Sequence, residues 1–253
     1  MRKAFLIIDR GSKEYEVQEE LFLISQKTKE KGDYVYSNFC FLEVIPPYIE
    51  EGINNCINQR VDLITVMPYF LYPGLKLKDA VKKTAEITKK LDLKLVITKP
   101  LCYSEMLSSV ILDRLTKLKV DNNIKFNDLE CDVLVIGHGS SDRRAREAFI
   151  FTVKNISQFY RNVEFCFLEL DIPNIEDGIK SLIKKDPKVI LIMPYFLHKG
   201  IHIKSDVIKE IRNTLEKHPF SNILIADHIG VDEKMIKLIL ERAKEVEKRI
   251  IKR

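Results

Sequence analysis

The chain has 253 residues, 45% of them hydrophobic, which is enough to build the core of one large domain or two ordinary ones. Its 42 lysine and arginine residues nearly balance its 37 aspartate and glutamate residues and form no basic block, which argues against nucleic-acid binding. The apolar runs are too short for a signal peptide or a membrane span, and the five cysteines form no CxxC pair. We therefore expect a cytoplasmic protein with reduced cysteines, of which Cys40 and Cys166 are small buried hydrophobes.

The first half of the sequence alternates short apolar runs with longer amphipathic segments. Strands are expected at 4–8, 36–42, 61–67 and 93–97, and helices at 14–31, 76–91 and 104–118. A further helix is expected to have Pro47 in its first turn, where a missing N–H group is tolerated.

The second half repeats this plan after a polar segment at 119–130. Strands are expected near 133–136, 163–168, 189–193 and 223–226, with a last helix from about residue 232. The pentapeptide FCFLE at 39–43 recurs at 165–169, and MPYFL at 67–71 recurs at 193–197. Two identical pentapeptides at the same offset of 126 residues indicate an internal duplication.

Strands that alternate with helices predict an α/β fold with parallel sheets covered by helices on both faces. We expect two tandem flavodoxin-like lobes, at 1–120 and 131–253, joined by a linker at 121–130 and related by a pseudo-twofold axis with a cleft between them. Each four-stranded sheet is expected to have the strand order 2-1-3-4. The residues that follow strands 1 and 3 then meet at one edge of the sheet, where α/β proteins bind ligands.

All five histidines lie in the second half, at positions 138, 198, 202, 218 and 228. His138 stands between two glycines after the first strand of that half, and His202 follows the third strand. The first half has Arg10 and Lys76 at the matching positions, and neither side chain binds a divalent metal at neutral pH. The replacement of both histidines together indicates that His138 and His202 form one metal site.

Three short motifs resemble the class II chelatases of the sirohydrochlorin type. They are Gly137-His138-Gly139-Ser140, Phe167-Leu168-Glu169, and the run from Pro194 through Gly200 to His202. The resemblance covers the whole chain as two tandem modules. It implies a lyase that inserts Co²⁺ or Fe²⁺ into sirohydrochlorin during cobalamin or sirohaem biosynthesis. It also implies that His138 and His202 contact the metal and that Glu169 is their acidic partner.

The chemistry of metallation fits these residue types. Two imidazoles bind Co²⁺, Fe²⁺ or Ni²⁺ without holding the ion permanently, so we expect the metal as a substrate and no tightly bound cofactor. Neutral histidines and the Glu169 carboxylate can accept the two pyrrole protons, which makes His138, His202 and Glu169 the candidate catalytic residues. Sirohydrochlorin is a polyanion, and the candidate residues for binding it are Arg10, Lys76, Ser140 and Lys204.

Several alternatives stay open at this point. Glu43, the twin of Glu169, lies in the half without histidines, so Glu169 could instead cap the helix near Pro173. Ser140 could hydrogen-bond its own turn, and neither glycine turn is a nucleotide-binding motif. His198 is expected in a loop, and His218 at a helix end in a carbonyl-capping or solvated role. His228 follows the fourth strand, and a position lining the far side of the cleft is not the favoured interpretation. The alternative to an enzyme is a tetrapyrrole carrier or metal-binding protein without turnover. A third possible function is that of a purely structural module.

Overall fold

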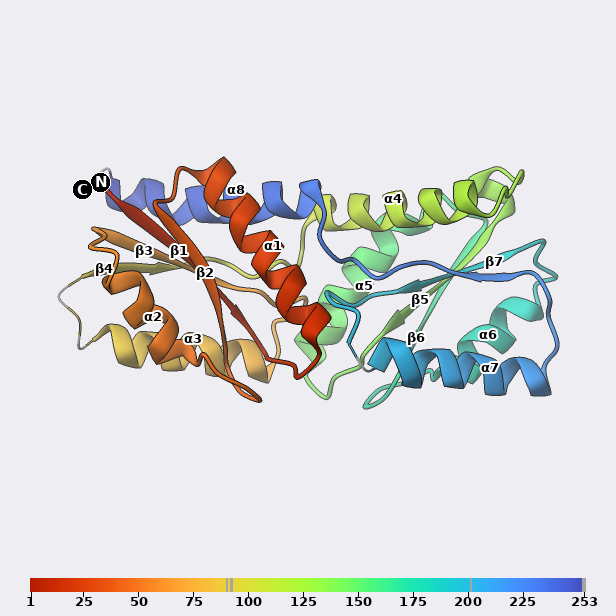
Figure 1. Ribbon diagram of the computed structural model, residues 1–253. Helices are drawn as coiled ribbons and strands as arrows, with labels where there is room; N and C mark the ends of the chain where they lie inside the picture. The colour runs from red at the N-terminus through yellow and green to blue at the C-terminus, as the bar shows by residue number, and fades with distance from the viewer. Residues whose placement is uncertain (90, 92, 201, 252–253) are drawn as a thin grey trace. The chain divides into compact units, whose positions relative to one another are not determined.

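A computed structural model describes residues 1–89, 91, 93–200 and 202–251; for residues 202–204 and 251 it describes only the backbone. The described strands form two four-stranded parallel sheets (Figure 1). The strand orders are β2-β1-β3-β4 and β6-β5-β7-β8. The predicted α/β class and the order 2-1-3-4 in each half are thus confirmed.

The strands and α-helices of the two copies match one for one, and the second copy has the additional π-helical turn η2. Those of the first copy are β1 (Lys3–Asp9), α1 (Tyr15–Gly32), β2 (Tyr36–Phe41), α2 (Ile49–Ile57), β3 (Leu63–Pro68), α3 (Leu75–Thr88), β4 (Lys94–Ile97) and α4 (Glu105–Asp121). A short 3₁₀ turn, η1 (Asp128–Glu130), connects them to the second copy. There the elements are β5 (Asp132–Gly137), α5 (Arg143–Ser157), β6 (Asn162–Phe167), α6 (Ile175–Ile183), β7 (Ile190–Pro194), η2 (His202–Val207), α7 (Ile208–Lys217), β8 (Ile223–Ile225) and α8 (Glu233–Ile251).

The prediction for Pro47 was wrong. Helix α2 begins at Ile49, after Tyr48 as its N-cap residue, so Pro47 lies before the helix. The carbonyl of Pro47 instead accepts a hydrogen bond from the N–H of Phe41 at 2.8 Å, which extends the end of β2. The Pro46–Pro47 peptide bond is cis.

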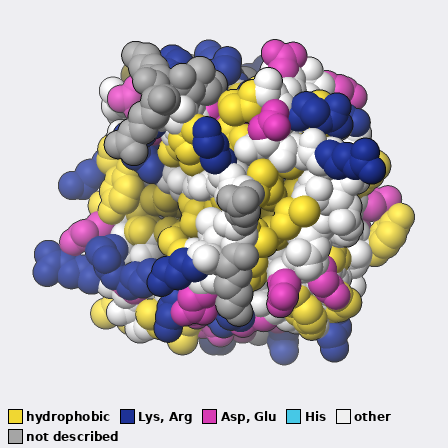
Figure 2. Space-filling view, turned by 90° about the vertical axis from the view of Figure 1, so that its left-hand side faces the viewer, with side chains coloured by type: hydrophobic (Ala, Val, Ile, Leu, Met, Phe, Trp, Pro, Cys, Tyr) yellow, Lys and Arg dark blue, Asp and Glu magenta, His cyan; other side chains and the backbone are white. Residues whose placement is uncertain are grey.

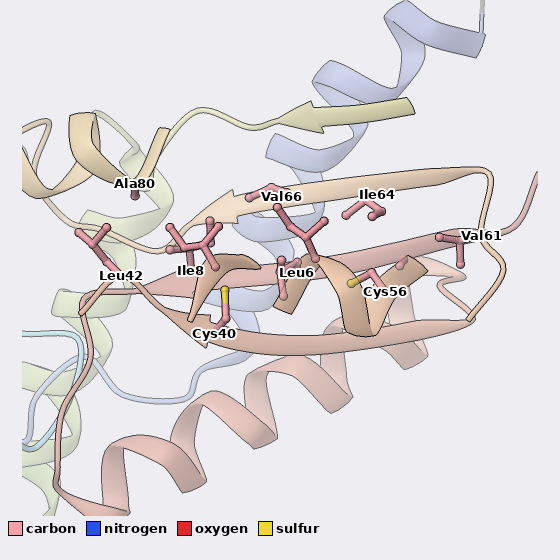
Figure 3. Packing of buried hydrophobic residues seen from close by; sticks show 12 residues of the cluster. Leu6, Ile8, Cys40, Leu42, Cys56, Val61, Ile64, Val66 and Ala80 are labelled. Atoms are coloured by element: carbon pink, nitrogen blue, oxygen red, sulfur yellow. The ribbon is translucent and has the colours of Figure 1, made fainter. Parts of the chain in front are cut away.

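Each sheet has a fully buried central strand, as parallel sheets covered on both faces require. In β1, the side chains of residues 4–8 are at most 1% exposed. Leu6 and Ile8 pack with Cys40 from β2 and Val66 from β3 in one apolar cluster (Figure 3). Cys40 and Cys166 are both fully buried, and all five cysteines are free thiols, which confirms the interpretation of these two as core residues.

The chain divides into two compact units whose boundaries differ from those of the repeats. Unit 1 comprises residues 1–102 and 231–253, and unit 2 comprises residues 103–230. Helix α8 packs in unit 1 against α1, β3 and β4, whereas α4 packs in unit 2 against α5 and β7 (Figure 1). The predicted boundaries at 120 and 131 follow the repeat, but each copy has exchanged its last helix with the other.

A buried carboxylate attaches α8 to unit 1. Glu247 is 4% exposed and accepts hydrogen bonds from the hydroxyls of Tyr34, at 2.6 Å, and Thr65, at 2.7 Å. Lys3 donates to its other oxygen at 2.9 Å. Burial, and secondly the Glu247 carboxylate, raise the pKa of Tyr34, so its hydroxyl stays protonated as a donor. These bonds give α8 polar partners in unit 1.

The outer face of unit 1 near the chain ends carries charges of both signs. Figure 2 shows lysine and arginine side chains on several sides of this face, with acidic side chains among them and hydrophobic side chains between. None of the described helices is both long enough and apolar enough to cross a membrane.

Candidate metal site

The site begins where the central strand of unit 2 ends. Strand β5 pairs with β6 on one side and β7 on the other, and its last residue is Gly137. His138 follows immediately, and the backbone then turns at Gly139, which has a φ of +94°. Gly137 itself is a strand residue paired with Phe167, so of the two glycines that flank His138 only Gly139 turns the backbone.

Gly139 allows two loops to touch. A Cβ atom at this position would lie 1.7 Å from the carbonyl oxygen of Glu169, so no other residue fits. Two backbone hydrogen bonds hold the contact: Leu168 donates to the carbonyl of Gly137 at 2.9 Å, and Glu169 donates to the carbonyl of His138 at 3.0 Å. The main chain therefore places His138 and Glu169 next to each other.

Their side chains meet as well. Nε2 of His138 lies 3.1 Å from Oε1 of Glu169, and the two side chains are 23% and 50% exposed. The imidazole also stands edge-on to the ring of Phe196, with 6.4 Å between the centroids. The second open interpretation of Glu169, as a helix cap, is wrong, because Asn174 caps α6 by accepting a hydrogen bond from Asp177. Glu169 lies two residues beyond the end of β6.

His202 follows β7, the neighbour of β5. It is the first residue of η2, a π-helical turn that leads into α7. Its side chain, like that of Lys204, lies outside what the structure describes. Among the side chains that are described, no group of three or more His, Cys, Asp and Glu residues is close enough to hold a metal ion. The described part of the candidate site is thus the pair of His138 and Glu169.

At the matching edge of the sheet in unit 1, cationic side chains contact the glutamate. Glu43 receives a hydrogen bond from Nε of Arg10 at 3.0 Å and one from Nζ of Lys76 at 2.6 Å. The hydrogen bond from Lys76, and less strongly that from Arg10, lower the pKa of Glu43. Gly11 is the counterpart of Gly139, with a φ of +111° and a Cβ position 2.2 Å from the carbonyl oxygen of Glu43. Two cations therefore surround the glutamate where unit 2 has histidines.

Ser140 and Ser12 have the turn role that the sequence indicates. The hydroxyl of Ser140 accepts a hydrogen bond from the N–H of Asp142 at 3.1 Å, and that of Ser12 accepts one from Glu14 at 3.1 Å. Asp142 then caps α5 by accepting a hydrogen bond from the N–H of Arg144. Ser140 thus fixes the backbone that follows His138.

The other three histidines lie elsewhere in unit 2. His198 is in a bend after β7, as predicted for a loop residue. His228 follows β8, and its carbonyl accepts a hydrogen bond from Arg114 at 3.1 Å. His218 ends α7, but its ring does not cap a carbonyl; Nε2 lies 3.3 Å from a carboxylate oxygen of Glu176.

An ion pair that the sequence analysis did not predict lies beside the site and holds the loop after Glu169 to α5. Nη1 of Arg146, on α5, forms an ion pair with Asp171 and donates to the carbonyl of Ile172 at 3.0 Å. The first copy has Gln18 and Ile45 at the positions of Arg146 and Asp171. Both charged residues occur only in the copy that has the histidines, and this difference between the copies could have predicted the ion pair.

Comparison with known proteins identifies relatives of the whole chain. The CbiX family model matches residues 4–118 and again residues 132–246. A sirohydrochlorin ferrochelatase of Priestia megaterium is 23% identical over 95% of this chain and 89% of its own length. A sirohydrochlorin cobaltochelatase of the same organism is 24% identical over 96% of this chain and 79% of its own length.

Solved structures share the fold. SirB from Bacillus subtilis with Fe³⁺ superimposes with a TM-score of 0.80 over 97% of this chain and 95% of its own, at 22% identity.

A shorter relative, the sirohydrochlorin cobaltochelatase of Sulfurisphaera tokodaii, is 31% identical over 45% of this chain and 92% of its own length. That protein therefore has about the length of one of the two repeats.

Proposed function

This chain belongs to the CbiX family, and from that premise we propose that it is a sirohydrochlorin chelatase, a lyase that inserts Co²⁺ or Fe²⁺ into sirohydrochlorin. The observation that carries the proposal is the pairing of His138 with Glu169 at the carboxyl edge of the unit 2 sheet, 3.1 Å apart and open to solvent. Parallel sheets bind their ligands at this edge. The names of the relatives supply the substrate, which the geometry alone would not identify.

In this proposal His138 and His202 hold the incoming ion. Imidazole nitrogens suit Co²⁺, Fe²⁺ and Ni²⁺, and two of them bind more weakly than the closed sets of four ligands found in structural sites. Weak binding is required because the ion must leave for the macrocycle. The metal is a substrate here, and the proposal includes no resident cofactor.

Glu169 is proposed to handle protons. Insertion of a divalent ion into the ring releases two pyrrole protons, and the bond from each nitrogen to its proton is replaced by a bond to the metal. The exposed Glu169 carboxylate can accept a proton and pass it to water, and its contact with Nε2 of His138, at 3.1 Å, orients the imidazole. Glu169 therefore acts as proton acceptor and as orienting partner in this proposal.

Cationic and hydroxyl groups are proposed to bind the carboxylates of the substrate. Arg10 and Lys76 remain 54% and 44% exposed although both contact Glu43, and the three side chains together carry one net positive charge. Such a cluster attracts carboxylates through charge-assisted hydrogen bonds. Lys204 and Ser140 complete the proposed set in unit 2.

The test is anaerobic metallation. Purified protein is mixed with sirohydrochlorin and Co²⁺ or Fe²⁺, and the visible absorption change is followed against a protein-free control. Acceleration over the control supports the enzyme. Tight binding of sirohydrochlorin without acceleration would favour a carrier of the tetrapyrrole. If the protein does not bind sirohydrochlorin at all, a purely structural role is the function that remains.

A further inference from the structure

The loop that carries Glu169 also exposes two large apolar side chains. Leu170 is 67% exposed and Ile172 is 75% exposed. Both follow Glu169 directly, and Glu169 contacts His138. Apolar surface therefore adjoins the proposed metal site.

The loop is braced rather than loose. Arg146 binds the carboxylate of Asp171 and the carbonyl of Ile172, and the N–H of Ile172 donates to Oδ1 of Asp171 at 2.8 Å. The guanidinium of Arg146 itself stacks over the ring of Phe167, 5.3 Å from its centroid. These contacts fix the backbone of residues 171 and 172, so the side chain of Ile172 is held in the solvent by its own loop.

The backbone at Leu170 makes a leucine the less stable choice. Its φ is +62°, in the left-handed region that favours glycine and asparagine and disfavours residues with a bulky Cβ substituent. Val44 has a φ of +78° at the matching position of unit 1, so the conformation belongs to the fold. At this position leucine is therefore less stable than glycine or asparagine would be, and a function for the side chain would explain its presence.

We propose that Leu170 and Ile172 position the substrate by packing against the face of the tetrapyrrole ring. This inference rests on the proposed function. The ring face of sirohydrochlorin is apolar and its carboxylates lie at the rim, so the two side chains match the face while the cationic groups match the rim. Because Leu170 directly follows Glu169, which contacts His138, a ring packed on Leu170 would lie beside the proposed metal site.

The experiment compares sirohydrochlorin binding by the wild type, Leu170→Asn, Ile172→Thr and the double variant, each without metal, by titration of sirohydrochlorin fluorescence. Asparagine suits the left-handed backbone and threonine keeps the β-branch, so both variants are expected to fold. Leu129→Asn is the matched control, because Leu129 is 66% exposed but lies in η1, before β5, at the opposite edge of the same sheet.

We expect the double variant to raise the Kd for sirohydrochlorin, and the KM for metallation, about tenfold, which corresponds to the loss of part of a leucine-sized apolar contact. The kcat and the affinity for Co²⁺ alone should stay within twofold of the wild type. The melting temperature of Leu170→Asn should equal or exceed that of the wild type. A purely structural role for Leu170 predicts the reverse, namely a lower melting temperature and an unchanged Kd.

The inference is overturned if the double variant binds sirohydrochlorin as tightly as the wild type and the Leu129 control do. If size-exclusion chromatography then shows a change in oligomeric state, the two side chains contact a second copy of the chain instead. The proposed enzyme fails separately, if the wild type binds sirohydrochlorin but does not accelerate metallation. In that case the Kd comparison still decides the role of the loop.

Discussion

Nζ of Lys76 lies 2.6 Å from Oε2 of Glu43, so a side chain from the first turn of α3 reaches the glutamate that follows β2. His202 is the repeat counterpart of Lys76, and Glu169 is the counterpart of Glu43, both 126 residues later. From this correspondence we propose that His202, like His138, belongs to a metal site beside Glu169.

The first prediction concerns the two histidines. His138→Ala and His202→Ala should each reduce the rate of metallation at least about a hundredfold, because one imidazole does not hold the ion long enough for transfer. Their melting temperatures should match that of the wild type within a few degrees; the His138 side chain is 23% exposed and lies at the end of its strand rather than in the apolar core. His218→Ala is the control, and normal turnover in either of the first two variants contradicts the assignment.

The second prediction is that unit 1 can be given a metal site. Arg10→His together with Lys76→His places two imidazoles beside Glu43, where the Lys76 and Arg10 contacts now lower the pKa of the carboxyl group. Equilibrium dialysis should then find one Co²⁺ more per chain than in the wild type.

The background variant for that measurement is His138→Ala with His202→Ala. Without the site in unit 2, the added site should raise the number of bound Co²⁺ ions from zero to one. An unchanged stoichiometry in both backgrounds would mean that the two copies differ in more than these side chains.

The third prediction concerns Gly139. A methyl group there would collide with the carbonyl of Glu169, and the φ of +94° is strained for alanine. Gly139→Ala should lower the free energy of unfolding by about 2–3 kcal/mol and reduce metallation, because it separates Glu169 from His138. Gly200→Ala is the control, since a Cβ atom there would meet none of the described atoms within 4 Å. Equal melting temperatures for the two variants would refute the argument.

The sequence was sufficient for the strands, their order and the edge of the sheet at which His138 lies. For Glu169 it left two roles open, as partner of the histidines and as helix cap. Buried parallel strands are continuous apolar runs, and the duplication made each copy a check on the other. It was not sufficient for Pro47 or for the loop at Leu170, because both depend on how the chain bends after a strand. The helix exchange was hidden for another reason: α4 and α8 occupy equivalent repeat positions, so similarity does not reveal which sheet each one covers.

The fourth prediction tests how α8 is held. Glu247→Ala removes the partner of Lys3, Tyr34 and Thr65 in a buried setting, so it should destabilise the chain by about 3–5 kcal/mol. Glu245→Ala, which removes the ion pairs of a 40% exposed carboxylate with Lys99 and Arg242, should cost about 1 kcal/mol or less. Thermal and urea unfolding measure the difference. Similar decreases in the free energy of unfolding in the two variants would show that Glu247 does not hold α8 in unit 1.

The fifth prediction separates the compact units from the repeats. A fragment of residues 103–230 contains every element of unit 2, including α4, whereas residues 131–253 lack α4 and retain α8, whose partners α1, β3 and β4 are absent. An uncovered sheet face exposes apolar surface, so the second fragment should aggregate or stay partly unfolded. We expect the first fragment to give a cooperative thermal transition by circular dichroism and to bind Co²⁺. If residues 131–253 fold as well as residues 103–230 do, α8 can cover either sheet. In that case the connections of the chain, and not the fit of the side chains, determine which sheet each helix covers.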